Sequence, residues 1–492
     1  MAVSRAHATH RSLSHLLLAG FNPLASTASS SFQGQARQSL SNPSLAPVPL
    51  SGWLAAVGRE ADVVDPLARP YSVRPGGIAG GAGHSLVTYR SWEGMDRIMA
   101  LGRNEAGQLG VGFASQEGTR GLVEGFEGEE ILSVRAGVQS TYVLVRDEGA
   151  FQPWPLASSR SRFLKDRTIL YSSGNLARGR LGQPALYSPS STAEDAESSR
   201  QHTLPRATVV ELPAGEGRLK QIEAGFEHLL VLTENGQVFG TGCNTDGQLG
   251  LGSASSDIYQ LTRLPLPREV EKEGGVERIS AGADTSAIIT KSGKVWTFGN
   301  SEYCQAMHGQ KIDQIVSPLP IDSSFLPSNR RIIDYRCGGS FALALDDRGS
   351  VYSAGYGALG LGKDTLQLQK PQRIDSLEGA GIDRIRAAWG YAAAVRDAED
   401  SSALFTWGLN TVHGRLGLGA LPHSSSSGPP NPHAPPAVPM HVYEPQEVKL
   451  PLRELGLDGT VGGRESVRWK LGEVELGMEG MWVGLDVSEE LD

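Results

Sequence analysis

Residues 219–252 read LKQIEAGFEHLLVLTENGQVFGTGCNTDGQLGLG, and this stretch contains the unit from which the chain is built. An alternating segment ends at Gly225, and an apolar run follows over residues 228–233. The turn Glu-Asn-Gly at 234–236 favours positive φ, so the residues after it are predicted to return as the second strand of a hairpin. A glycine-punctuated loop at 242–250 follows, where a Cβ would be costly.

This unit recurs along the chain. The glycine that ends the first strand recurs, with Ala388 in its place in one copy, at Gly81, Gly137, Gly225, Gly282, Gly338 and Gly477. The glycine that ends the returning strand recurs at Gly102, Gly174, Gly242, Gly299, Gly355 and Gly408. Successive units start 56, 88, 57, 56, 50 and 89 residues apart, so two gaps carry insertions. Repeats of this length with strand-turn-strand content predict the blades of a β-propeller.

The two ends of the chain hold complementary halves of one unit. Residues 473–487 supply the first half, and residues 15–22 resemble the second half, in which a strand enters Gly-x-Asn. We therefore predict an all-β, seven-bladed β-propeller over residues 15–487, closed by pairing of the terminal strands, because closure removes the open edges of a linear array. Surface insertions are expected at about residues 25–70, 146–168, 184–206 and 420–442, and a tail at 488–492.

Composition limits the classes of function. The formal charge of −9 argues against a surface dominated by nucleic-acid contacts. The 61 glycines among 492 residues exceed the usual share of roughly 7%, and their fixed positions indicate turns. The three cysteines lie in different repeats without C-x-x-C spacing, so neither a disulfide framework nor a zinc site is expected, and a reducing compartment fits. No run of 18 apolar residues occurs, so no membrane span is expected.

The beginning of the chain has the composition of an organelle transit peptide. The first 59 residues contain no Asp or Glu, but they hold four arginines and many serines. Residues 1–14 are therefore predicted to be a mitochondrial targeting segment, ending before the strand expected from residue 15. An ordinary polar tail in front of that strand is the alternative.

Three loops share the pattern Gly-x-Asn-x-x-Gly-Gln-Leu-Gly or a close variant: GRNEAGQLGVG (102–112), GCNTDGQLGLG (242–252) and GLNTVHGRLGLG (408–419). Together with the Gly-x-x-His that opens the apolar strand, this pattern resembles the repeat of the regulator of chromosome condensation family. FGNSEYCQA (298–306) and CGGSFALALDDRGSVYSAGYGALGLGK (337–363) resemble most closely the mitochondrial branch of that family in animals and fungi.

The resemblance implies a propeller in the mitochondrial matrix or peripheral on the inner membrane, with the nucleus or the cytoplasm as the alternative address. Our first hypothesis is a non-catalytic scaffold that assists respiratory-complex assembly or the maturation of the mitochondrial ribosome and its RNA. The alternative is a guanine-nucleotide exchange factor for a small or dynamin-type GTPase, which rests on analogy at the level of the fold. The expected partners are an assembly client, a GTPase or RNA-associated complexes.

The histidines of the repeat, His84 and His228, are interpreted as buried structural groups that hydrogen-bond backbone at a blade edge. Catalytic or ligand roles are the alternative. The Gly-x-Asn loops do not connect a strand to a helix, as a phosphate loop does. Asp284, Asp346 and Asp347 are interpreted as turn or cap carboxylates. No nucleophile elbow, Walker motif, HExxH or kinase signature occurs, so we expect no enzyme, no cofactor and no metal site.

Two insertions carry groups that suit a partner or a ligand. The first is basic, and its candidate partner-binding residues are Arg160, Arg162, Lys165 and Arg167. These side chains suit an acidic protein or RNA, and a solvated loop is the alternative. The Ser/Pro/His tract 421–441 holds His423, His433 and His441, for which we favour a solvated loop over metal binding.

Overall fold

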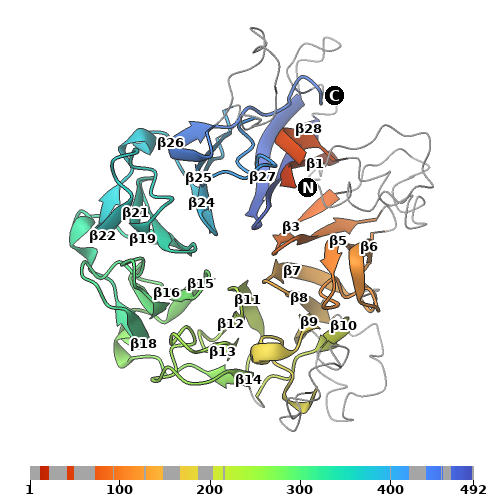
Figure 1. The fold of residues 1–492 in the computed structure, drawn as a ribbon, viewed down its shortest axis with the longest axis horizontal. Coiled ribbons are helices and arrows are strands. Elements are labelled where there is room, and N and C mark those ends of the chain that lie inside the picture. Colours follow the sequence, from red (N-terminus) through yellow and green to blue (C-terminus); the bar gives the residue numbers. More distant parts are fainter. Residues whose placement is uncertain are drawn as a thin grey trace, which may run out of the picture.

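The computed structural model of the chain is a seven-bladed β-propeller, in which seven four-stranded antiparallel sheets surround a central axis (Figure 1). The predicted fold class is thus confirmed. The structure describes residues 11–21, 41–48, 72–91, 94–126, 129–147, 167–186, 203–213, 216–398, 401–419, 439–455, 457 and 467–489.

The first three blades contain twelve strands in chain order. They are β3 (Ser72–Gly80), β4 (His84–Arg90), β5 (Asp96–Asn104) and β6 (Ser115–Leu122) in blade 1; β7 (Glu130–Ala136), β8 (Ser140–Asp147), β9 (Arg167–Asn175) and β10 (Thr203–Val209) in blade 2; and β11 (Leu219–Ala224), β12 (His228–Thr233), β13 (Val238–Gly242) and β14 (Ile258–Arg263) in blade 3.

The next three blades repeat this order. They are β15 (Val276–Ala281), β16 (Thr285–Thr290), β17 (Val295–Asn300) and β18 (Gln314–Pro320) in blade 4; β19 (Ile332–Cys337), β20 (Phe341–Asp346), β21 (Val351–Tyr356) and β22 (Gln367–Arg373) in blade 5; and β23 (Arg384–Ala388), β24 (Tyr391–Arg396), β25 (Ala403–Leu409) and β26 (His441–Glu447) in blade 6. Short helical segments are α2 (Arg268–Lys272) and 3-10 turns at Ala177–Gly179, Pro184–Leu186, Ser323–Phe325 and Asp375–Leu377.

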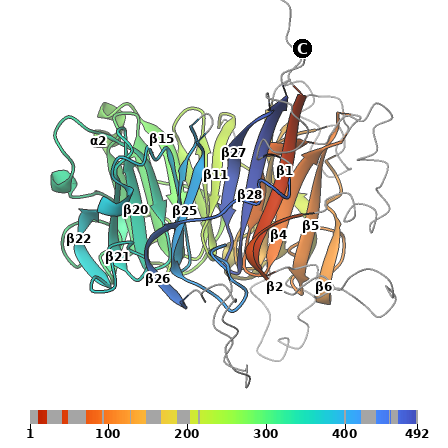
Figure 2. The same cartoon turned by 90° about the horizontal axis from the view of Figure 1, so that it is seen from above.

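Blade 7 joins the two ends of the chain. Its strands are β27 (Val467–Leu476) and β28 (Gly480–Glu489) from the C-terminal part, and β1 (Arg11–Phe21) and β2 (Ser41–Pro47) from the N-terminal part. β1 pairs antiparallel with β28 from Arg11 opposite Glu489 to Gly20 opposite Gly480 (Figure 2). The predicted closure by terminal strands is therefore present, although β1 begins at Arg11 instead of residue 15.

The core is divided into layers between neighbouring blades. In β12 every residue is buried, because successive side chains point to opposite faces and both faces are covered. Leu230 and Leu232 pack with residues of blade 4, whereas Leu229 and Val231 pack with residues of blade 2. The second strand of a blade, covered on both faces in this way, therefore has a continuous apolar run in its sequence.

The outer strands are the elements that the sequence analysis did not predict. β2 lies within the insertion expected at 25–70, and β10 and β26 begin at Thr203 and His441, inside two other expected insertions. Five of the seven outer strands contain proline, which is tolerated at a sheet edge because no ladder hydrogen bond is lost there. No helix in the described part of the chain is long and apolar enough to cross a membrane.

Candidate functional site: the central channel and the loop face

The innermost strands of the blades line a channel on the propeller axis with a cavity of about 120 Å³. In six blades one channel residue stands two positions before the repeat glycine or Ala388: Arg135, Glu223, Ser280, Arg336, Arg386 and Glu475. This ring of mainly charged side chains was not predicted, although the fixed offset from the glycine is visible in the sequence.

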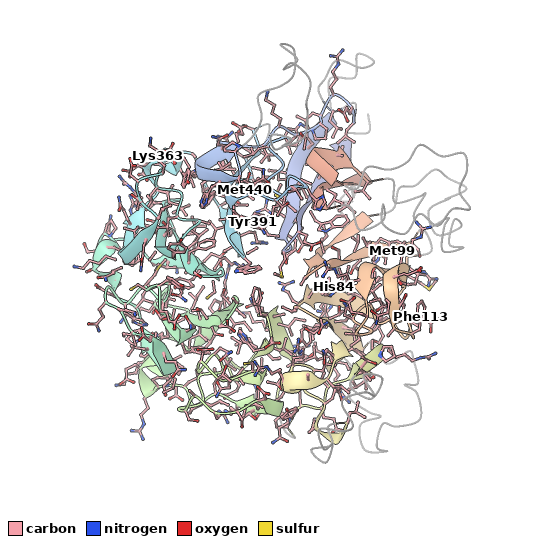
Figure 3. All side chains as sticks on the ribbon, in the orientation of Figure 1. His84, Met99, Phe113, Lys363, Tyr391 and Met440 are labelled. Carbon is pink, nitrogen blue, oxygen red and sulfur yellow. The ribbon has the colours of Figure 1, made fainter. Side chains whose placement is uncertain are left out.

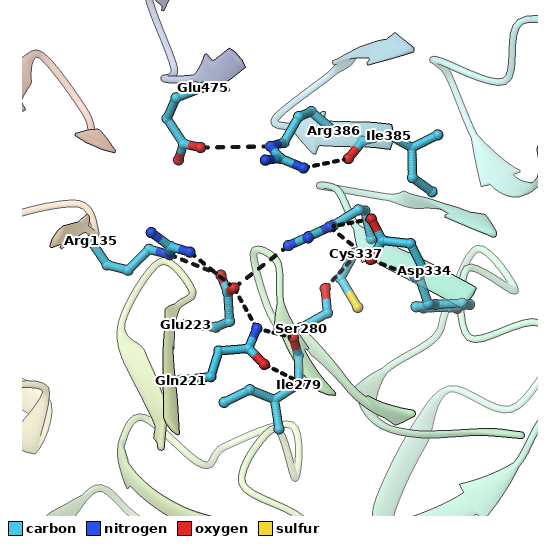
Figure 4. Close-up of polar contacts among 12 residues, drawn as sticks. Arg135, Gln221, Glu223, Ile279, Ser280, Asp334, Cys337, Ile385, Arg386 and Glu475 are labelled. Atoms are coloured by element: carbon cyan, nitrogen blue, oxygen red, sulfur yellow. Dashed lines mark hydrogen bonds and ion pairs between the residues drawn. The ribbon is translucent and has the colours of Figure 1, made fainter. Parts of the chain in front are cut away.

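Most charges of the channel pair with one another (Figure 4). The Arg135 guanidinium contacts both oxygens of Glu223 at 3.2 and 3.3 Å, and Arg336 lies 3.5 Å from the same carboxylate. Burial alone would lower the pKa of Arg135, but the Glu223 carboxylate raises it above its ordinary value. Arg386 Nε lies 3.9 Å from Glu475. Since these contacts join different blades, the ring ties the inner strands together.

One end of the channel is covered by aromatic side chains. The rings of Phe226 in blade 3 and Trp389 in blade 6 meet edge to face with centroids 5.7 Å apart. A Cβ at Gly339 would lie 2.4 Å from Trp389 Cδ1, so the indole lies directly over the turn of blade 5. Trp389 nevertheless keeps 50% of its surface exposed. This arrangement places a rigid, half-exposed indole at the mouth of the channel.

The loops that follow the third strands lie at the same end of the propeller as this aromatic pair. His228, which starts β12, stands opposite Gly242, which ends β13, and the other blades repeat this pairing. Large apolar side chains are exposed at this end of blades 4–6, and we call this set the aromatic face: Tyr303, Tyr356, Leu366, Trp389, Leu409, Val412, Met440 and Tyr443. Tyr303 and Tyr356 are in contact, with ring centroids 5.3 Å apart.

The loops themselves are held by their own amides. Asn244 Oδ1 accepts from Leu249 N at 3.0 Å, and Gln248 Oε1 accepts from Asp246 N at 2.9 Å. These N–H groups are therefore bonded within the loop, as expected for a structural turn and unlike a phosphate cradle. In blade 5 the loop between the matching glycines is shorter, because Gly355 and Gly360 are five positions apart where Gly242 and Gly250 are eight apart.

The repeat histidines connect neighbouring blades. His84 Nε2 lies 3.2 Å from Thr141 Oγ1, and His228 Nε2 lies 2.9 Å from Ser286 Oγ. The partner of each Nε2 is thus a hydroxyl of the next blade, whereas the sequence analysis expected backbone, which His84 also contacts at Ser140. Burial lowers the pKa of both imidazoles to about 4, so they are neutral at physiological pH. Tyr391 occupies this position in blade 6 and donates to the Gly477 carbonyl of blade 7 at 2.7 Å.

The repeat glycines stand where a side chain has no room or an unfavourable φ. The six glycines that end the returning strands have φ between 102° and 125°. A Cβ on Gly242 would lie 2.3 Å from the Glu227 carbonyl oxygen, and one on Gly225 would lie 2.1 Å from the His228 ring. Both glycines therefore permit close approach of backbone at the turn.

Of the predicted basic partner-binding residues, the structure describes Arg167. Arg160, Arg162 and Lys165 lie outside the described residues. Arg167 begins β9 opposite Asp147, at the end of blade 2 away from the aromatic face. In the histidine tract, His441 stacks on Tyr443 at 4.3 Å, whereas the other two histidines lie outside the described residues.

The remaining predicted carboxylates have distinct environments. Asp346 closes its turn by accepting from Arg348 N and Ser350 N, both at 2.9 Å, and it pairs with Arg330 at 2.7 Å. Asp347 lies 3.7 Å from Arg331. Asp284 is different, because burial and the nearby carboxylates of the loop face raise its pKa to about 6. In the described part of the chain, no group of three His, Cys, Asp or Glu side chains is arranged to hold a metal ion.

Comparisons with known proteins found a matching repeat family and several similar proteins. The Regulator of chromosome condensation (RCC1) repeat matches residues 235–289 and 292–345, and a second model of the same repeat matches residues 219–248 and 276–305. The chain is 28% identical over 350 residues to the mouse RCC1-like G exchanging factor-like protein, covering 69% of each chain. It is 27% identical over 351 residues to the Ultraviolet-B receptor UVR8 of Arabidopsis thaliana, covering 70% of this chain and 66% of the receptor.

Solved structures support the same fold. Human WBSCR16 superposes with a TM-score of 0.66 at 19% identity, covering 97% of this chain and 100% of that one. Prp20p from Saccharomyces cerevisiae superposes with a TM-score of 0.63 at 16% identity, covering 98% and 92%. At these identities the likeness concerns the architecture of the propeller.

Proposed function

Because the chain belongs to the regulator of chromosome condensation (RCC1) repeat family, we propose that it is a non-catalytic protein-binding propeller whose client docks on the aromatic face. The observation that carries this proposal is the gathering of exposed apolar side chains at one end of three adjacent blades. Trp389 and Tyr356 are 50% and 47% exposed, and Val412 is 71% exposed. Apolar groups collected on one surface are typical of protein-interaction sites, and Trp and Tyr are the residues that most often dominate them.

The packing that supports these side chains also favours a docking surface. Trp389 is braced by Phe226 and by the turn of blade 5, and Tyr356 is braced by Tyr303. Anchors that are already ordered lose little side-chain entropy on binding, so more of the contact energy appears as affinity. A propeller of this kind holds a client in place without taking part in a reaction.

The double variant Trp389→Ala/Tyr356→Ala tests the proposed docking surface. We expect it to lose the proteins that crosslink to and co-purify with the full chain, while its melting temperature stays near that of the wild type. Phe113→Ala is the matched control, because Phe113 is 52% exposed but lies on blade 1, away from the aromatic face (Figure 3). Recovery of the same proteins by all three forms would refute the proposed surface.

We further propose that the clients are mitochondrial assembly factors of a respiratory complex or of the ribosome and its RNA. The acid-free first 59 residues support this address. A reporter fused to residues 1–14 should enter mitochondria, and replacing Arg5 with Glu should weaken import. A reporter that stays in the cytosol or enters the nucleus would reject the address.

Nucleotide exchange is the second candidate, because the mouse and human relatives are both named RCC1-like G exchanging factor-like protein. An exchange factor must bind the nucleotide-free GTPase better than the loaded one, since only a difference in affinity shifts that equilibrium. A scaffold has no such preference. We expect client capture to be equal with GDP, GTP or a chelator of magnesium. Faster release of labelled GDP from a captured GTPase would favour exchange instead.

A further inference from the structure

The aromatic face has an acidic border on blades 3 and 4. Glu227 follows Phe226 in the turn between β11 and β12, and Asp284 follows Ala283 in the matching turn of blade 4. Asp246, in the loop after β13, is close enough to Asp284 to raise the pKa of its carboxyl. The three carboxylates therefore stand beside the apolar residues that cover the channel.

Two of these carboxylates form no ion pair with a cation of the described residues. Among the described residues, Asp246 and Asp284 have no basic side chain within 4.0 Å. Their polar neighbours are amides: Gln248 Nε2 lies 3.4 Å from Asp284, and Asn300 Nδ2 lies 3.4 Å from Asp246. Two nearby carboxylates without a cation repel each other, so an added cation gains attraction and also relieves that repulsion.

The nearest cations are already engaged with other groups. Arg180 and Arg178 of blade 2 hold Glu227 at 2.8 and 3.1 Å. Lys311 of blade 4 lies 3.1 Å from Asp313. Arg178 is near enough to Asp284 to lower the pKa of its carboxyl, but the ion pairs of Arg178 are with Glu227 and Asp257.

Further acidic groups stand among the apolar side chains. Glu302 is exposed next to Tyr303, and Glu444 is exposed next to Tyr443. The arginine of the blade 6 loop, Arg415, is buried over the Tyr391 ring at 4.3 Å and donates to the Met478 carbonyl at 2.6 Å. The surface thus combines exposed aromatic anchors with carboxylates, of which Asp246 and Asp284 form no ion pair with a described cation.

We propose that the client segment that docks on the aromatic face is a basic amphipathic peptide. Its apolar side chains cover Trp389 and Tyr356, and a Lys or Arg side chain lies between Asp246 and Asp284. A cation shared by two carboxylates makes charge-assisted hydrogen bonds, which are stronger than neutral ones. Complementary charge around an apolar centre also selects the partner and speeds its encounter. This inference rests on the proposed function, since it names the chemistry of the same surface.

A short peptide of alternating Lys and Leu is the probe, and its analogues with Gln or Glu in place of Lys are the comparisons. We expect the Lys peptide to bind the full chain at least tenfold more tightly than the Gln peptide, as measured by fluorescence anisotropy, and the Glu peptide not to bind. Raising the salt concentration should weaken the Lys peptide alone. Equal binding of the three peptides would overturn the proposal.

Variants of the protein locate the binding. Asp246→Asn/Asp284→Asn should lower the affinity for the Lys peptide about tenfold, and Trp389→Ala/Tyr356→Ala should lower its affinity and that of the Gln peptide. The control is Glu269→Gln/Glu271→Gln, which makes the same charge change on α2, at the opposite end of the propeller (Figure 2). Equal loss in this control would show general attraction to an acidic protein and would also overturn the proposal.

The two proposals fail in different ways. If the acid variant binds the Lys peptide as the wild type does, but Trp389→Ala/Tyr356→Ala still loses its clients, the docking surface stands and the basic character of the client is wrong. If the aromatic variant keeps every client, the docking surface itself is wrong.

Discussion

At the scale of single residues, one repeat position is filled by different side chains that do the same work. His84 and His228 reach a hydroxyl of the next blade, and Tyr391 reaches a carbonyl there. The position of the loop glutamine also bridges neighbouring blades. Gln248 contacts Asp284 of the following blade, and Arg180, at the same position in blade 2, contacts Glu227 of blade 3. What the repeat retains is a polar bridge between blades, which several side chains provide.

His228→Ala should lower the free energy of unfolding by about 1–3 kcal/mol, because Ser286 loses a buried hydrogen-bond partner and the imidazole leaves a cavity. The loss should be nearly constant above about pH 7.5 and should shrink by about 1 kcal/mol at pH 6, because the imidazole of the unfolded wild type is protonated there while burial keeps the pKa of the folded His228 at about 4. Urea denaturation at several pH values measures it. A loss of stability as large at pH 6 as at pH 8 would contradict the neutral, buried state of the imidazole.

Gly242→Ala tests the close approach of the loop to the neighbouring turn. With φ at 111° and the Glu227 oxygen 2.3 Å from the new Cβ, we expect a loss above about 2 kcal/mol. Gly379→Ala is the matched control, because Gly379 also has positive φ, at 74°, but no atom lies within 4 Å of its added Cβ. That variant should cost only the backbone strain, about 1 kcal/mol. Equal losses in the two variants would remove the steric argument.

At the scale of elements, β27 is held to both neighbouring blades at an irregularity in its pairing with β28. The register shifts between Leu471 and Val474. Arg384 of blade 6 donates to the Leu471 carbonyl at 2.7 Å, and Arg386 donates to the Val474 carbonyl at 2.9 Å. On the other side, Glu473 accepts from Gly77 N of blade 1 at 3.0 Å.

Glu473 gives this junction a dependence on pH. Burial, and then the neighbouring Glu475 carboxylate, raise the pKa of Glu473 to about 7. Because the pKa of Glu473 is higher in the folded state than in the unfolded state, protonation of this carboxyl stabilises the fold. This stabilisation is complete below pH 4.5, the ordinary pKa of the group, and is lost as the pH rises to about 7. Glu473→Gln should remove up to about 3 kcal/mol of that dependence when unfolding is followed between pH 5 and 8. An unchanged pH profile would show that Glu473 is ionised throughout.

At the scale of the whole molecule, stability depends on closing the ring. Leu17 and Ala19 of β1 pack into the cluster shared by blades 5, 6 and 7, whereas Leu16 and Leu18 pack with blade 1. Trp482 of β28 donates to Ser85 of blade 1 at 3.0 Å. The last blade therefore carries core residues of both its neighbours.

Removing residues 11–21 should destabilise the whole propeller in one cooperative step and promote aggregation. The deletion takes buried leucines from two layers and leaves β28 with an unpaired edge. Removing residues 190–200, which lie outside the described strands, is the control and should change the melting temperature little. Equal melting temperatures of the two shortened chains and the wild type in calorimetry would contradict the dependence of stability on ring closure.

The sequence predicted the parts of the fold that depend on repeated local chemistry. The inner three strands of each blade follow from apolar runs and fixed glycines, and the half-units around Gly20 and Gly477 predicted the closure. The outer strands escaped prediction because prolines and exposed polar side chains at a sheet edge read as loop.

The candidate site was the less predictable part. The aromatic face draws Tyr303, Tyr356 and Trp389 from three different blades, and no pattern along the chain marks them as neighbours. The basic insertion was predicted as a binding site because charge is visible in the sequence, and this stays a prediction, since Arg160, Arg162 and Lys165 lie outside the described residues. Exposure of an aromatic side chain is visible only once the blades are arranged around their axis.

The pairing of β1 with β28 also imposes an order on biosynthesis. A ribosome that adds about 5–20 residues per second needs roughly half a minute to a minute and a half between Phe21 and Glu489. Throughout that interval β1 has been made but its pairing partner has not. The first described strand to be translated thus completes its pairing only at the end of synthesis, and Leu16, Leu17 and Leu18, which are buried in the finished propeller, lack their β28 neighbours until then.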